Sequence, residues 1–306
     1  MVSRREFLAL SLVGGSLLRA KERIGRSRIS AISDEVATSP DEAIGFAKQY
    51  GLQWLELRNV PGAKRPYFFM EPDELKPAAR QFADNGIRIS FLNTNLLKFP
   101  LPGTEPANKK NETPEARGKR LPRDQAQFDQ RLDDLRKCIR AAHAFEMENI
   151  RVFTFSRVAE PGKLFPRIAE ILEPMAKVAE NEGVRLLIEN EPSQNAGSCA
   201  ETAAVLRMSA PKSVGTNWDA LNGVGLETPF PDGYNLLPKD RIWNVQWKGK
   251  SILDTPQRLD WAAILHALER DGYTGELGLE THYFDGTNLE KSHASMEEML
   301  RIVGAS

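Results

Sequence analysis

The sequence has 306 residues, of which 41% are hydrophobic and 27% charged, with 41 lysines and arginines against 42 aspartates and glutamates. This length and composition exclude a disulfide-stapled miniature domain and a disordered chain, and they suit two medium domains or one large α/β barrel. The net charge of −1 argues against a nucleic acid partner, which would call for a clustered basic face. The two cysteines, Cys138 and Cys199, form no CxxC motif, and four histidines are too few for a histidine-rich polynuclear metal site.

The first residues differ from the rest of the chain. Arg4 and Arg5 precede an uncharged stretch over residues 7–18, which is too short for a membrane-spanning helix of about 20 apolar residues. The segment is similar to a twin-arginine export signal, with Ala9 where such signals usually have lysine. We therefore expect residues 1–28 to be a signal that the twin-arginine machinery recognises, and the protein to be periplasmic or otherwise extracytoplasmic. Cleavage of the signal and its retention as a membrane anchor are both left open.

Residues 29–306 alternate short β-type runs with longer helical stretches, and no linker divides them into halves. Several runs follow a glycine that suits the position just after a helix, as at Gly51, Gly86, Gly183 and Gly272. The eight runs cover residues 29–33, 53–57, 87–92, 149–155, 184–188, 214–218, 242–247 and 276–279. The repeated helix–glycine–strand step indicates parallel strands. Eight such units predict a single-domain (β/α)8 TIM barrel rather than an open doubly wound sheet.

Capping residues and apolar spacing predict several of the helices between these runs. Ser39 followed by Pro40 is a helix N-terminus signal, with Ser39 as the N-cap. Apolar side chains recur at steps of three and four over residues 124–147, 168–178 and 261–268, which predicts a helix in each segment.

Two segments predict loops. Residues 222–241 give only a weak helical signal. Residues 102–123 are polar and rich in proline, and they predict a flexible loop on the face that follows the third strand, where long loops often act as lids.

In a barrel of this kind the chemistry lies at the carboxyl ends of the strands. The fifth to eighth runs end near three carboxylates and one amide, which are Glu189, Asp219, Gln246 and Glu280. Alternation along each strand points all four into the barrel. Such an oxygen-rich set suits one divalent ion, Mn²⁺ or Mg²⁺ in the first place and Zn²⁺ or Co²⁺ as alternatives. A bound ion would also remove the repulsion among the carboxylates.

The arrangement resembles the xylose-isomerase-like TIM-barrel family of sugar phosphate isomerases and epimerases, over essentially the whole chain after the signal. The segments that carry the resemblance are LELR (55–58), LLIENE (186–191), NWDALN (217–222), NVQWKG (244–249) and GYTGELGLETHY (272–283). The resemblance implies that Glu189, Asp219, Gln246 and Glu280 bind the metal. It also implies that Glu189 and Glu280 are the catalytic residues and move protons on opposite faces of the substrate.

Three positions depart from the family's pattern. Family epimerases usually have histidine at the position of Gln246 and aspartate at the position of Gly249. Members that use glutamine as the ligand include 3-dehydroshikimate dehydratases. Glu191 replaces a common histidine, and its carboxylate could bind a sugar hydroxyl or act as a base. These departures leave chemistry other than epimerisation open.

The sequence supports three classes of function. A divalent ion bound to the carbonyl and hydroxyl oxygens of a keto-sugar acidifies the neighbouring C–H bond and stabilises an enediolate. Returning the proton gives an isomerase or epimerase, which we favour. Expelling a β-substituent gives a lyase or dehydratase of a 3-keto-glycoside or related keto-polyol, and an exported sugar-binding protein without turnover is the third class. Export, and the lack of a glycine-rich phosphate cradle after the last strands, favour an unphosphorylated carbohydrate.

Six further residues are candidate contacts for the substrate: Glu56, Arg58, Asn93, Glu191, Lys248 and His282. Glu56 and Arg58 could equally form an internal ion pair, and Asn93 could serve a turn. Lys248 would steady a developing oxyanion or lie at the rim as an ordinary lysine. His282 is the only histidine expected near the site, since the other three fall in helical stretches. The oligomeric state is left open, with a homo-oligomer as one alternative.

Overall fold

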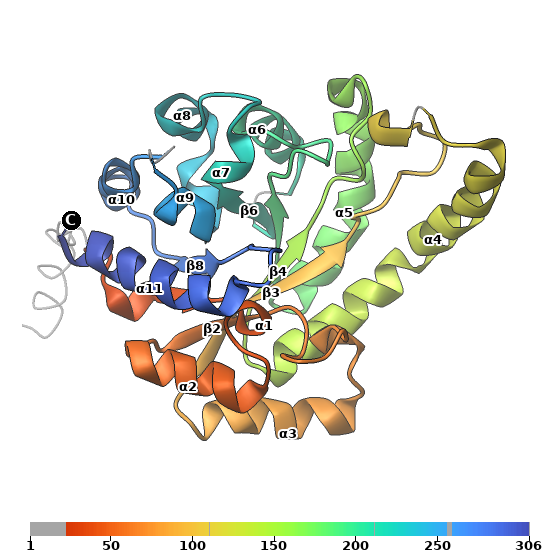
Figure 1. The fold of residues 1–306 in the computed structure, drawn as a ribbon. Coiled ribbons are helices and arrows are strands. Elements are labelled where there is room, and N and C mark those ends of the chain that lie inside the picture. Colours follow the sequence, from red (N-terminus) through yellow and green to blue (C-terminus); the bar gives the residue numbers. More distant parts are fainter. Residues whose placement is uncertain (1–22, 110, 211, 256–258, 306) are drawn as a thin grey trace, which may run out of the picture.

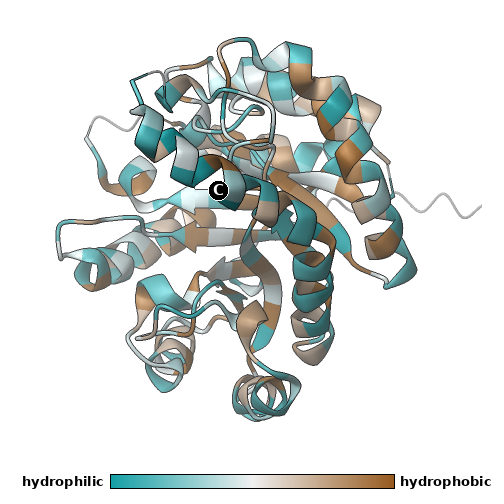
Figure 2. Cartoon of the chain, turned by 90° about the vertical axis from the view of Figure 1, so that its right-hand side faces the viewer, coloured by the Kyte–Doolittle hydropathy of each residue, from teal (hydrophilic) through white to brown (hydrophobic). Residues whose placement is uncertain are grey.

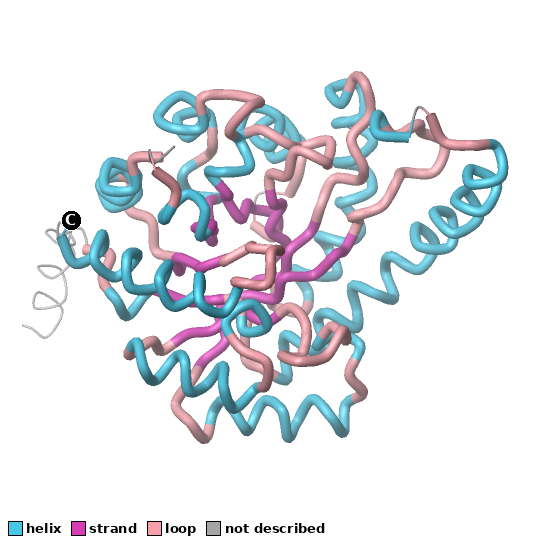
Figure 3. The backbone as a smooth tube through the Cα atoms, viewed as in Figure 1, coloured by secondary structure: helices cyan, strands magenta, loops and turns pink. Residues whose placement is uncertain are grey.

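The computed structural model describes residues 23–109, 111–210, 212–255 and 259–305 (Figure 1). Its strands are β1 (Ile29–Ala31), β2 (Trp54–Leu57), β3 (Arg88–Leu96), β4 (Asn149–Val152), β5 (Arg185–Glu189), β6 (Val214–Asp219), β7 (Ile242–Lys248) and β8 (Glu276–Glu280). These strands pair in parallel, in the order β1-β8-β7-β6-β5-β4-β3-β2. Figure 3 shows the strands in the interior of the molecule, with helices around them. A bridge between Ile32 and Glu56 links the first strand to the second. The predicted (β/α)8 barrel is confirmed.

Helices lie between the strands and surround them. They are α1 (Ser33–Val36), α2 (Pro40–Tyr50), α3 (Pro72–Ala83), α4 (Pro114–Ala144), α5 (Phe165–Asn181), α6 (Cys199–Met208), α7 (Ala220–Gly223), α8 (Tyr234–Leu236), α9 (Gly249–Leu253), α10 (Trp261–Arg270) and α11 (Asn288–Ala305). Short 3₁₀ or π turns lie at Arg26–Arg28, Tyr67–Phe69, Ala107–Lys109, Pro161–Leu164, Pro229–Gly233 and Lys239–Arg241. Residues 222–241, predicted as a loop, hold only short helical segments.

The start and end of α2 follow the predicted signals. The Ser39 hydroxyl accepts a hydrogen bond from the amide of Glu42, and Pro40 is the first helical residue. Gly51 ends the helix at φ +65°, a left-handed conformation that glycine adopts without strain. These local features turn the chain directly into β2.

The helix predicted from residue 124 begins ten residues earlier, at Pro114, so the loop prediction for residues 102–123 is wrong over its second half. Thr113 caps this helix by accepting from the amide of Ala116. Arg120 is buried and pairs with Glu112 and Asp124 at 2.8 and 2.9 Å. The polar composition of this segment is typical of a solvated loop. Here the charged side chains instead pair with one another along a helix.

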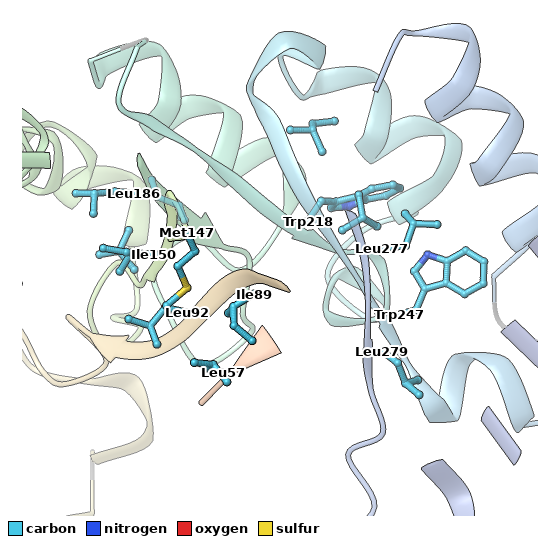
Figure 4. Packing of buried hydrophobic residues seen from close by; sticks show 14 of the residues in the cluster. Leu57, Ile89, Leu92, Met147, Ile150, Leu186, Trp218, Trp247, Leu277 and Leu279 are labelled. Carbon is cyan, nitrogen blue, oxygen red and sulfur yellow. The ribbon is translucent and has the colours of Figure 1, made fainter. Parts of the chain in front are cut away.

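The core lies between the barrel and its helices. Figure 4 shows side chains of this core in two groups, with Leu186 near Ile150 in one and Trp218 near Leu277 in the other. Trp247 stacks on Trp261 of α10, with ring centroids 4.0 Å apart. Hydrophilic residues lie along the outward faces of the helices (Figure 2). The burial of these apolar side chains holds the strands in place, and the strands in turn position the side chains at their carboxyl ends.

The predicted signal lies mostly outside the described residues, including both Arg4 and Arg5. Ile24 is buried, and its amide donates to Glu269 Oε1 at 2.7 Å. Within the described part of the chain, no helix has the length and apolarity needed to cross a membrane.

Candidate active site

Three carboxylates meet at the carboxyl ends of β5, β6 and β8. Glu189, Asp219 and Glu280 each offer one oxygen, and these three oxygens all lie within 4.8 Å of one another. All three side chains are buried, with at most 4% of each residue exposed. Each is the last residue of its strand, so the barrel geometry itself brings them together. We call these three residues the carboxylate cluster.

Lys248, at the end of β7, enters this cluster. Its Nζ lies 3.0 Å from Asp219 Oδ2 and 3.4 Å from Glu280 Oε2. It also donates to Asn222 Oδ1 at 2.7 Å. The register of β7 and β8 explains the contact, because Lys248 and Glu280 lie side by side in the sheet.

Arg151 of β4 holds the third carboxylate. Its Nη1 donates to Glu189 Oε2 at 2.8 Å, and the same oxygen accepts from Asn217 Nδ2 at 2.9 Å. The Nε of Arg151 is fixed by the carbonyl of Thr94 at 3.0 Å. Among the described residues no donor reaches Glu189 Oε1, so this oxygen is available to a ligand.

Gln246 lies deeper in the barrel, in register with Asp219. Its Nε2 donates to Glu56 Oε2 at 2.6 Å. A carboxylate oxygen accepts and cannot donate, so this bond places the amide nitrogen toward Glu56. Gln246 Oε1 is buried and accepts no hydrogen bond within the described residues.

Glu56 is fully buried and is surrounded by donors. Besides Gln246, it accepts from Asn93 Nδ2 at 2.8 Å, Ser30 Oγ at 3.0 Å and Asn244 Nδ2 at 3.3 Å. Gly278 leaves the space it needs, since a Cβ there would lie 2.0 Å from Glu56 Oε1. Two predicted substrate contacts, Glu56 and Asn93, therefore bond to each other below the carboxylate cluster.

Burial and mutual charge shift the pKa values of the cluster. Burial raises the pKa of Asp219 to about 6; Lys248 opposes this, while Glu280 and Glu189 add to it. Burial also raises the pKa of Glu280, but Lys248, His282 and Arg151 together outweigh burial and hold the pKa well below its usual range. For Lys248 itself, burial lowers the pKa, and the carboxylates of Asp219 and Glu280 more than reverse that effect. The ammonium and the two carboxylates thus stabilise one another's charged forms.

The rim beside β8 carries a second charged group. Arg58 donates from Nε to Asp34 at 3.1 Å and from Nη1 to Glu35 at 2.9 Å, and Nη1 lies 3.9 Å from Glu280 Oε1. His282 donates its backbone amide to Glu35 Oε2 at 2.9 Å, and its Nδ1 lies 3.4 Å from Glu280 Oε1. The φ of His282 is +55°, a conformation that costs energy in a residue with a Cβ and often marks a functional position.

Glu191 lies beyond the end of β5 and pairs with Lys98 at 2.9 Å, instead of with the carboxylate cluster. Burial raises the pKa of Glu191, but the charge and hydrogen bond of Lys98, with Lys248 and Ser193, together outweigh burial and lower the pKa. Lys98 Nζ also lies 4.4 Å from the ring centroid of the buried Phe153.

The oxygens of the four predicted ligands fit a hard divalent cation. Asp219 Oδ2, Gln246 Oε1 and Glu280 Oε2 are buried without a hydrogen bond from any described residue. The hydrogen bonds that Glu189 accepts from Arg151 and Asn217 both go to its Oε2. Lys248 forms ion pairs with Asp219 Oδ2 and Glu280 Oε2, although these two oxygens accept no hydrogen bond from a described residue. Carboxylate and amide oxygens are the donors that Mg²⁺ and Mn²⁺ prefer.

The sequence did not point to Arg151, Asn222, Asp34 or Glu35. Asp34 and Glu35 come shortly after β1, so the strand-end rule that found the carboxylate cluster would have found them too. Asn222 follows the end of β6 at the same distance as Asp34 follows β1, so the same rule would have found it. Arg151 carried no such signal, because it lies inside β4 and not at its end.

Comparison with known proteins agrees with this architecture. Residues 44–302 match the family described as xylose isomerase-like TIM barrel. The sequence matches none of the curated proteins with which it was compared.

Solved structures share the fold at low sequence identity. D-allulose 3-epimerase from Methylomonas sp., in complex with D-allulose, is 13% identical with a TM-score of 0.63, over 92% of this chain and 97% of that one. The 3-keto-D-glucoside 4-epimerase YcjR from E. coli is 12% identical with a TM-score of 0.60, over 90% and 98%. A xylose isomerase-like TIM barrel protein from Mycobacterium smegmatis, in complex with magnesium, is 15% identical with a TM-score of 0.61, over 90% and 98%. With the family match spanning most of its length, this chain belongs to the xylose isomerase-like TIM barrel family.

Proposed function

We propose that this protein is a divalent-metal-dependent isomerase or epimerase that acts on an unphosphorylated sugar or keto-sugar. The observation that carries the proposal is the carboxylate cluster, in which three strands each end in a buried carboxylate and one oxygen of each lies within 4.8 Å of the other two. The magnesium complex and the sugar epimerases among the structural neighbours support it.

Glu189, Asp219, Glu280 and Gln246 would hold the metal, with Mn²⁺ or Mg²⁺ favoured over Zn²⁺ or Co²⁺ by the all-oxygen donor set. When bound, the ion would polarise the carbonyl oxygen of the substrate and stabilise the enediolate left when the neighbouring carbon loses a proton.

Two residues would move the proton. The positive charges of Lys248 and Arg151 and the contact with His282 lower the pKa of Glu280, which favours the ionised form that a general base requires. Glu189 approaches from β5 and is oriented by Arg151 and Asn217, with its Oε1 free. Proton removal by one carboxylate and return by the other would give an epimer or an isomer, depending on the carbon that receives the proton.

Arg58, His282, Lys248 and Glu191 would contact the substrate from the rim. Arg58 and His282 both lie near Glu280 Oε1, so a hydroxyl bound there would be close to the proposed base. Asn93 and Glu56 would contribute through the buried network beneath, which holds Gln246.

A lyase or dehydratase acting on a 3-keto-glycoside or related keto-polyol is the second candidate. Gln246 in place of the usual histidine favours it, because glutamine ligands occur in family members that eliminate. Both candidates share proton removal next to a carbonyl and differ only in the fate of the enediolate. A sugar-binding protein without turnover is the weaker alternative, since binding alone does not require three carboxylates buried against one another.

An assay of free ketoses and 3-keto-glycosides with added Mg²⁺, read by NMR, tests the proposal. We expect an epimer or isomer of at least one compound and loss of activity with a chelator. An unsaturated or aglycone product would instead identify the lyase. Binding of a sugar with no conversion of any compound would favour the binding protein.

A further inference from the structure

Lys248 occupies the position that a metal ion would need. Its ammonium contacts oxygens of Asp219 and Glu280, which are two of the proposed ligands. Both of these oxygens are buried and lack any other partner within the described residues. The ammonium is therefore the one cation placed directly between them in the described part of the chain.

A divalent ion and this ammonium cannot both hold the two oxygens. Magnesium binds oxygen at about 2.0–2.1 Å, so an ion shared by Asp219 and Glu280 would lie inside the contacts that Lys248 now makes. Two positive charges within about 4 Å of each other also repel strongly at a buried site. Binding of the metal therefore requires Lys248 to withdraw.

Asn222 provides a place to which Lys248 can withdraw. Its Oδ1 accepts from Lys248 Nζ at 2.7 Å, and its Nδ2 donates to the carbonyl of Asn190 at 2.9 Å, which fixes the orientation of the amide. The contact with Asn222 does not involve any oxygen of the carboxylate cluster. Lys248 can keep it while giving up Asp219 and Glu280.

We propose that Lys248 is a built-in counter-ion that a divalent metal must displace from Asp219 and Glu280, and that it thereby weakens metal binding. This inference rests on the metal site of the proposed function. It accounts for how residues of this chain compensate three buried carboxylates: Lys248 pairs with Asp219 and Glu280, and Arg151 pairs with Glu189. After displacement the ammonium would stay bound to Asn222, beside the carboxylate cluster, where a substrate oxygen could contact it.

Lys248→Met tests the proposal, because methionine has a similar length and no charge. The full chain is treated with a chelator and titrated with MnCl₂ by calorimetry. We expect Lys248→Met to bind Mn²⁺ at least about tenfold more tightly than the unchanged protein, since a competing unit charge has been removed. Without metal the variant should melt at a lower temperature, and saturating Mn²⁺ should raise its melting temperature by more than that of the unchanged protein.

Lys250→Met is the matched control. Lys250 is exposed on α9, two residues along the chain, and its substitution makes the same change in net charge outside the cluster. The Mn²⁺ affinity of this variant should equal that of the unchanged protein. Equal tightening in both variants would mean that net charge alone acts, and that result would overturn the proposal.

The outcomes separate this inference from the proposed function. Unchanged or weaker Mn²⁺ binding by Lys248→Met, with clear binding by the unchanged protein, overturns the counter-ion role and leaves the metal site standing. No binding by either folded protein overturns both. Should Lys248→Met not fold, crystal structures of the unchanged protein with and without Mn²⁺ decide: the Lys248–Asp219 contact must be present without the ion and broken with it.

Discussion

Gln246 Nε2 lies 2.6 Å from Glu56 Oε2 in the interior of the barrel, and this bond determines which atom of the amide remains without a partner. While Glu56 is ionised it can only accept, so the amide oxygen of Gln246 faces away from it and is the atom left for a metal ion. Glu56 thus orients a proposed ligand without touching the metal, as carboxylates behind metal-bound histidines do.

Glu56→Ala should weaken metal binding. The substitution frees the amide of Gln246 to rotate, and loss of such an orienting partner typically costs about 10- to 100-fold in affinity. Calorimetric titration of the chelator-treated protein with MnCl₂ measures the effect. Asn93→Ala is the control, because it removes another donor to Glu56 and leaves the bond to Gln246 in place. Equal affinities for Glu56→Ala and the unchanged protein would refute the orienting role.

The same carboxyl group predicts a pH dependence of stability. Burial raises the pKa of Glu56 to about 7 against an ordinary 4.5, and its four donors only partly offset that effect. A raised folded-state pKa gives stability that is full below about pH 4.5 and is lost as the pH rises through 7. Relative to Glu56→Gln, which cannot ionise there, the metal-free protein should lose roughly 3 kcal/mol of unfolding free energy between pH 4.5 and 7.5. Urea unfolding measures this difference, and a pH-independent value would contradict the raised pKa.

Glu189→Gln and Glu280→Gln should each lower turnover by about 10²- to 10⁴-fold, the usual contribution of a positioned general acid or base. Each change keeps an oxygen ligand and removes a proton acceptor, so most of the metal should stay bound. Steady-state kinetics at saturating Mn²⁺ tests this, with melting temperatures to check the fold, because Glu189→Gln also removes the partner of Arg151. Normal turnover by both variants would shift attention to Glu191, Lys248 and His282.

Asp219→Ala should behave differently from the two glutamine variants. Asp219 has a proposed role as a ligand and none in proton transfer, so excess Mn²⁺ should restore much of its activity. Activity measured as a function of Mn²⁺ concentration separates the two classes. If no concentration of Mn²⁺ restores the activity of Asp219→Ala, Asp219 has a role beyond metal binding.

The fold was largely predictable, because its signals are local. Each signal spans only a few residues: a glycine follows several of the helices, and eight apolar runs mark the strands. Every run overlaps an observed strand. The prediction was wrong in a charged segment. Residues from Pro114 onward form a helix, in which charged side chains such as Arg120 and Asp124 pair with each other.

The site was predictable at the ends of the strands and not between them. The inward direction of Glu189, Asp219 and Glu280 follows from alternation, so the carboxylate cluster could be anticipated. The position of Lys248 within it depends on side-chain conformation across neighbouring strands. The hydrogen bonds that Glu56 accepts come from strands far apart in the sequence, as with Asn244. No pattern within a short segment predicts such contacts.

The export prediction concerns residues 1–28. Fused to a folded reporter, they should direct it out of the cytoplasm by the twin-arginine route, and Arg4→Lys combined with Arg5→Lys should block export. Fractionation of cells with and without that route measures the result. Export that does not depend on the arginine pair would refute the signal assignment.

The proposed function requires that a carbon next to a carbonyl lose its proton in this site. Incubation of the Mn²⁺-loaded protein with ketoses and 3-keto-glycosides in D₂O, followed by mass spectrometry of the recovered compounds, measures this step. We expect one deuterium at the carbon beside the carbonyl in at least one compound, even without net conversion, and none with Glu189→Gln combined with Glu280→Gln. Conversion of a compound without deuterium uptake, or no uptake in any compound, would contradict it.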